Sequence, residues 1–63
     1  MFTWTIGNEY QVLGKGYSMK KEWALEDAIK AAKELRKQTS YPVIWSVKWA
    51  IGNAKTEIWD VIE

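Results

Sequence analysis

The 63-residue chain contains no cysteine and no histidine. Without cysteine it can form neither a disulfide nor a thiolate nucleophile, and without both residue types the common zinc sites are excluded. The missing histidine also removes the side chain that most often acts as a general base near neutral pH. Because a domain of this size buries only about 60% of its unfolded surface, packing or a partner has to supply the stability that cross-links would provide.

Long apolar runs and a strong excess of one charge are missing as well. No stretch approaches the roughly 20 apolar residues that a membrane span needs, and no basic segment followed by an apolar stretch marks a signal peptide. We therefore expect a cytoplasmic protein, a location that suits the absence of cysteine. Nine basic and eight acidic side chains leave a net charge of +1, which is weak evidence for nucleic-acid binding because basic excess usually dominates that affinity.

What the chain does have in unusual number is tryptophan, with five residues. Some of them can fill a small core, but Trp is enriched in binding hot spots, so five indicate that others contact a partner. Two of them belong to a near-repeat, because WTIGN at 4–8 returns as WAIGN at 49–53. We interpret it as one strand end and Gly-Asn turn used twice, and not as a duplicated unit or ligand site.

The first 16 residues predict a hairpin. Residues 2–6 alternate apolar and polar side chains, residues 7–8 signal a turn, and residues 10–13 continue as a second strand. A three-residue loop at 7–9 is preferred, because a two-residue loop would place Glu9 and Gln11 beside the apolar side chains of the first strand. The preferred face then carries Phe2, Trp4, Ile6, Tyr10 and Val12.

The glycines at 14 and 16 have two possible roles. The stretch Gly14-Lys15-Gly16 lacks the length and context of a phosphate-binding loop. We interpret it as a bend or bulge, or as glycines that leave room for an aromatic ring.

A helix is predicted to begin near Ala24 and to end before Pro42. Its apolar residues recur at spacings of three and four, which forms a narrow stripe: Leu25, Ala28, Ile29, Ala32 and Leu35. Trp23 lies roughly 200° round the helix from Leu25 and is therefore off the stripe. The segment 17–23 is left open between an extension of the strand and the entry to the helix.

Residues 43–51 alternate and predict the best strand of the chain, followed by a Gly-Asn turn and a returning strand at 56–62. With a three-residue loop, which we prefer, Trp59 and Val61 join the face of Trp45 and Trp49. Under that register three isoleucines fall together on the opposite face: Ile44, Ile58 and Ile62. With a two-residue loop Lys48 would face Glu57, and the residues of the returning strand would exchange faces.

These elements predict an α+β fold: a single ββαββ domain over residues 1–63, with a four-stranded antiparallel sheet and one helix packed on one face. The expected strand order is 2-1-3-4. Four strands make a sheet roughly 19 Å wide, whereas one helix is about 10 Å across. Aromatic surface should therefore remain uncovered, so we expect association through a sheet face or a strand edge, with another protein or with a second copy.

Catalysis is not expected, because the serines have no histidine to activate them and no two carboxylates are spaced as a paired acid–base site. No cofactor or metal is expected either. We interpret the chain as a non-catalytic protein-binding module, a small adaptor or inhibitor that occludes a partner's surface. Its size and expected architecture resemble those of short phage-encoded proteins that block host enzymes, a likeness that rests on no sequence motif.

Five residues are the predicted contacts with the partner: Trp23, Trp49, Trp59, Ile58 and Ile44. The alternative function is single-stranded nucleic-acid binding, in which bases stack on sheet tryptophans interleaved with Lys48 and Lys55. Against it, the preferred register places Lys48 on the face away from the tryptophans.

Overall fold

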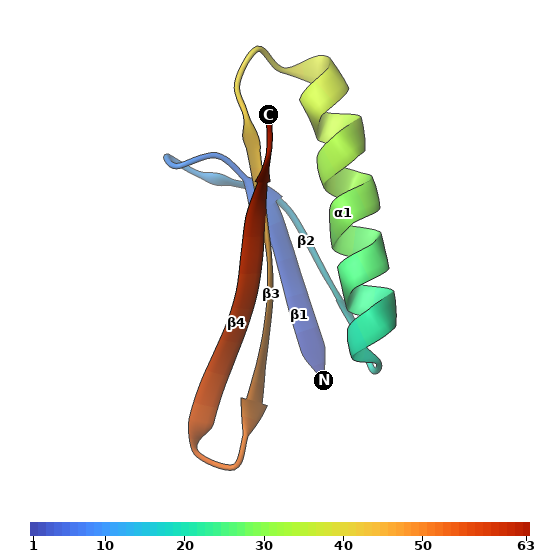
Figure 1. Ribbon diagram of the computed structural model, residues 1–63, viewed down its shortest axis with the longest axis vertical. Helices are drawn as coiled ribbons and strands as arrows, with labels where there is room; N and C mark the ends of the chain where they lie inside the picture. Colours follow the sequence, from blue (N-terminus) through green and yellow to red (C-terminus); the bar gives the residue numbers. More distant parts are fainter.

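The computed structural model describes residues 1–63 as one antiparallel sheet and one helix (Figure 1). The elements are β1 (Phe2–Gly7), β2 (Val12–Ser18), α1 (Lys21–Gln38), β3 (Val43–Ile51) and β4 (Ala54–Ile62). The strand order is β2-β1-β3-β4, and the helix packs against one face of the sheet. The predicted α+β class, the ββαββ order and the strand order are confirmed.

The helix begins at Lys21, three residues before the predicted start at Ala24. The open segment is therefore divided, with residues 17–18 ending β2 and residues 21–23 starting α1. Three alanines spaced four apart, at 24, 28 and 32, are 0% exposed. Because alanine has almost no side chain, the helix backbone can approach the sheet closely and the large side chains of the strands fill the layer between them.

The first hairpin differs from the prediction. The loop covers residues 8–11, β2 pairs Trp4 with Gly16 and Ile6 with Gly14, and the register shifts next to Gly7. The predicted three-residue loop is wrong, and so is the placement of Tyr10 and Val12 on the helix side, since they are 84% and 62% exposed.

Two contacts explain this register. The side-chain Oδ1 of Asn8 accepts hydrogen bonds from the backbone N–H of Tyr10 and of Gln11, at 2.8 and 3.0 Å, which closes a longer loop. A Cβ atom added to Gly16 would lie 2.5 Å from Cζ2 of Trp4. The shifted register thus sets a glycine against the Trp4 ring, and the prediction that the glycines make room for an aromatic ring is confirmed for Gly16, whereas Gly14 faces the side chain of Ile6.

The second hairpin has the two-residue loop that the sequence left as the alternative. Ile51 pairs with Ala54, so the turn is the two-residue Gly52-Asn53, and Lys48 faces Glu57. Gly52 has a φ of 60°, the conformation that a type II′ hairpin requires at its first central residue. The preferred three-residue loop is wrong here as well.

This register exchanges the two faces of β4. Ile58 and Ile62 lie on the helix side, opposite Val47 and Val43, and not on the far face with Ile44 as predicted. Trp59 and Val61 lie on the far face and not beside Trp45. The exchange lets two isoleucines extend the core at the edge of the sheet, where α1 makes its fewest contacts.

The core lies between α1 and the two central strands. Ile6, Val43, Trp45 and Val47 are buried against the three alanines of the helix. Trp4 and Trp49 lie on the same side of the sheet but remain half-buried. Trp49 is covered by the Phe2 ring, whose centroid is 5.4 Å away, and by Lys21, whose Nζ lies 5.2 Å from the indole centroid.

Candidate functional site

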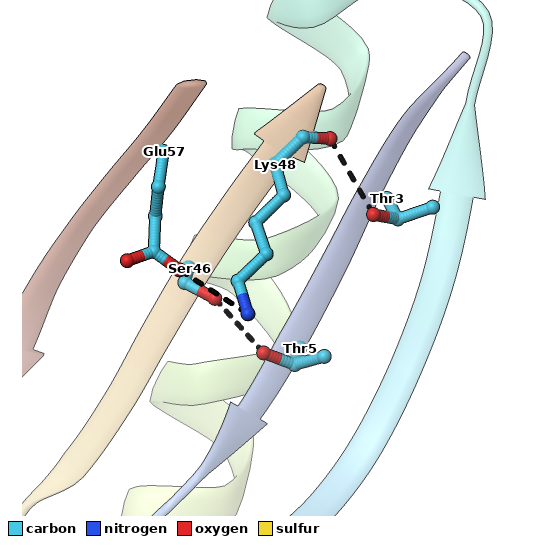
Figure 2. A network of polar contacts seen from close by, with 5 residues as sticks. All are labelled: Thr3, Thr5, Ser46, Lys48 and Glu57. Carbon is cyan, nitrogen blue, oxygen red and sulfur yellow. Dashed lines mark hydrogen bonds and ion pairs between the residues drawn. The ribbon is translucent and has the colours of Figure 1, made fainter. Parts of the chain in front are cut away.

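The face of the sheet away from α1 has no covering layer, and we call it the open face. Its centre is a polar stripe on β1, β3 and β4 (Figure 2). The Thr3 hydroxyl donates to the Lys48 carbonyl at 3.4 Å, and Lys48 Nζ lies 3.3 Å from Glu57 Oε2. The hydroxyls of Thr5 and Ser46 share a hydrogen bond of 2.9 Å. Small hydrogen-bonded side chains therefore occupy the middle of this face.

A groove with a volume of ≈ 420 Å³ opens at one end of the open face. Its floor contains the apolar side chains of Ile44 and Val61, which are opposite each other on β3 and β4. Its walls come from the β1–β2 loop and from the loop between α1 and β3, which supply Tyr10 and Tyr41. In Figure 1 the β1–β2 loop projects away from the helix. Asn8, Glu9 and Pro42 complete the lining.

Both loops are held by local hydrogen bonds. Asn8 ties the β1–β2 loop as described above, and Gly7 lets it fold back, because a Cβ there would lie 2.2 Å from the Gln11 carbonyl oxygen. In the other loop the Thr39 hydroxyl donates to the Tyr41 carbonyl at 2.9 Å and accepts from the Tyr41 N–H at 3.2 Å. The two tyrosine side chains, 84% and 68% exposed, are thus presented by ordered backbone.

Trp59 continues this surface along β4. It lies two residues before Val61 on the same face, opposite Ser46, and is 60% exposed. We call the following five residues the open-face patch: Tyr10, Tyr41, Ile44, Trp59 and Val61. Large aromatic rings around a small apolar floor form the kind of surface on which hot-spot contacts concentrate.

The five predicted contact residues do not form one surface. The structure brings Ile44 and Trp59 together on the open face. Trp49 and Ile58 lie on the opposite side and pack at the margin of the core. Trp23 is 54% exposed on α1, where Lys20 Nζ lies 4.7 Å from its ring centroid.

Two tyrosines and one valine of the patch were missed by the sequence reasoning. Tyr10 and Tyr41 each stand in a short turn segment, beside Asn8 and Pro42, where an exposed aromatic ring is a signal of contact. That the two rings lie close together could not be read from the chain, because it depends on the positions of two loops, 8–11 and 39–42, that the fold brings together. Val61 was assigned to the wrong face together with the whole of β4.

No group of carboxylate side chains is placed to hold a metal ion. The helix α1 does not contain an apolar stretch long enough to cross a membrane. No protein-family model matches the chain, and no curated protein or solved structure is significantly similar to it.

Proposed function

We propose that the protein is a non-catalytic protein-binding module that acts by occupying a partner's surface with the open-face patch. The observation that carries the proposal is the position of Trp59, 60% exposed on the uncovered face and next to the groove formed by Ile44 and Val61. A large apolar side chain is costly to leave in water, and burying a Trp or Tyr removes about 150–250 Å² of surface. Burial of these rings would supply most of the binding energy.

The polar stripe suits the same role. A partner that lies on Trp59 and the groove also covers Ser46 and Thr5, where one hydroxyl donates to the other at 2.9 Å. This bond satisfies one of the two O–H donors, so the partner has to supply a single acceptor for the second. The Lys48–Glu57 pair beside them is exposed and would lie at the polar rim of the contact. The mode of action is steric occlusion, in the manner of a small adaptor or inhibitor.

The test compares two exposed tryptophans on different sides of the molecule. Immobilised wild-type protein, Trp59→Ser and Trp23→Ser are each exposed to extract of the source cells, and the captured proteins are compared. We expect Trp59→Ser to lose at least tenfold of the captured partner, which is what the loss of a hot-spot side chain does, while Trp23→Ser retains it. Equal capture by all three proteins, or equal loss in both variants, would contradict the proposal; circular dichroism checks that each variant is folded.

Single-stranded nucleic-acid binding is a second candidate, and one observation favours it. The two-residue turn at 52–53 brings Lys48 and Lys55 to the same face as Trp59, and Tyr17 and Lys15 lie on that face on β2. Lys48 and the exposed tryptophan therefore share a face. Their expected placement on opposite faces had been the reason against this function. However, Lys48 is paired with Glu57 and the net charge is only +1.

The two candidates differ in their response to salt. Nucleic-acid binding through these lysines predicts that an oligonucleotide of single-stranded DNA or RNA is retained at low salt and released steeply as salt rises. The measurement is fluorescence anisotropy of a labelled oligonucleotide, with Lys55→Glu as the variant and Lys33→Glu on α1 as its control. No retention at low salt would exclude this candidate and leave the protein-binding proposal in place.

A further inference from the structure

The outer edge of β4 is not paired with any strand. Two contacts define the direction of its backbone groups. The Lys48 carbonyl accepts a bond from Thr3 on β1 and so points away from β4, and the Val61 N–H donates to its neighbour Asp60 Oδ1 at 2.7 Å and not to β3. Since directions alternate along an antiparallel strand, the N–H and C=O groups of the odd-numbered residues face outward: Lys55, Glu57, Trp59 and Val61.

This edge is long enough to accept another strand. β4 has nine residues, and the helix makes its fewest contacts with it. Its side chains on the helix side include Ile58 and Ile62, which are only half-buried. An extended strand with outward backbone donors and apolar side chains on both faces is a template for sheet extension.

We propose that a second copy of this chain pairs with β4 in antiparallel orientation, with the two-fold axis at Trp59. The charges of the side chains decide which residue lies on the axis. In an antiparallel pair, residues directly opposite each other point to the same face of the sheet. In a two-fold symmetric pair this requires one residue to lie on the axis, opposite its own counterpart, and odd-numbered residues to pair with odd-numbered residues. An axis at Glu57, Ile58 or Trp59 keeps most of the nine residues paired.

These three registers differ in charge. An axis at Glu57 sets two glutamates directly opposite each other, which is unfavourable. An axis at Ile58 brings no opposite charges together. An axis at Trp59 places Lys55 opposite Glu63 of the second copy, twice by symmetry, and opposes no like charges. Charge complementarity therefore selects Trp59.

At this register the two Trp59 residues exchange both backbone hydrogen bonds, and their indoles lie side by side on the open face. Glu57 pairs with Val61 of the second copy, whose N–H exchanges its bond with Asp60 for a bond to the Glu57 carbonyl. The two four-stranded sheets join into one continuous sheet, and both helices lie on the same side of it. The inference goes beyond the proposed function, because it uses the outer backbone edge of β4, which the proposed function does not involve.

A charge exchange tests the pairing and its register. Sedimentation velocity over a range of concentrations measures self-association of the wild type, Lys55→Glu, Glu63→Lys and the double variant. Both positions are exposed, so the variants should fold as the wild type does, and thermal unfolding checks this. We expect the wild type to dimerise, each single variant to raise the dissociation constant roughly tenfold, because two attractive pairs become repulsive, and the double variant to regain wild-type affinity. Lys33→Glu on the exposed side of α1 changes the net charge as Lys55→Glu does and should have no effect.

A wild-type protein that stays monomeric at high micromolar concentration would overturn the proposal. A dimer that responds to neither single variant, or that is not restored in the double variant, would overturn the Trp59 register. Capture of a different protein through Trp59 is measured separately, and the two charge variants leave the open-face patch intact. Failure of the dimer and failure of the protein-binding function are thus distinguishable.

Discussion

Replacing Trp45 by alanine is expected to remove much or all of the stability of the protein at room temperature. Trp45 is 7% exposed on a central strand, between the helix alanines and Ile6, and truncation of a buried Trp costs about 3–5 kcal/mol. A 63-residue domain has a total stability of roughly 3–9 kcal/mol, at about 0.05–0.15 kcal/mol per residue. The loss therefore consumes much or all of it. The measurement is urea unfolding followed by circular dichroism.

The matched control is Trp59→Ala, which removes the same side chain from the neighbouring strand on the opposite face. Because Trp59 is 60% exposed, its loss should change the free energy of unfolding by only about 0.5 kcal/mol. If the two variants were equally destabilised, Trp59 would belong to the folding core and the open-face patch would lose its central residue.

The second large effect is expected for Gly16→Ala. The added methyl group would lie 2.5 Å from Cζ2 of the Trp4 ring, and that ring packs against the core. Either the ring leaves its position or β2 moves away from β1, and overpacking of this kind costs typically about 1–3 kcal/mol. The measurement is the urea midpoint, together with the near-ultraviolet dichroism that reports the setting of the tryptophan rings.

Gly14→Ala provides a graded control two residues away on the same strand. Its added Cβ would meet the side chain of Ile6 at 3.0 Å, a looser contact with a smaller and more adjustable group. We expect Gly14→Ala to be the milder of the two changes. If it were the more harmful, the first hairpin would have a register other than the pairing of Trp4 with Gly16.

The helix and the covered side of the two central strands were predictable because their signals are periodic and local. Three- and four-residue spacing of Leu25, Ala28 and Ala32 indicates a helix with a thin apolar stripe, and alternation at 43–51 indicates a strand with Trp45 on its buried side. The confirmed strand order follows from the short connections and from the return of one helix between two hairpins. None of these conclusions requires knowing which residues lie opposite each other.

The predicted contact set failed where it depended on hairpin register. A change of one residue in the length of the turn at 52–53 exchanges the faces on which Trp59 and Ile58 lie. The three-residue loop preferred from the sequence was the wrong length. The signal for the correct choice was present, because the two-residue turn sets Lys48 opposite Glu57. An exposed ion pair contributes only up to about 1 kcal/mol, which is too little to decide between registers without the packing of β4 against the core.

The order of residues was thus enough to specify the elements, their succession and the inward-facing residues of the two central strands, since each depends on patterns within one segment. Tertiary structure decided the register of both hairpins, because register depends on which side chains fit across strands: Gly16 against the Trp4 ring, and Ile58 against Val47. The same fit left Trp59 outside, next to two tyrosines brought from distant loops. The candidate site is therefore a product of packing, assembled from residues that no local pattern connects.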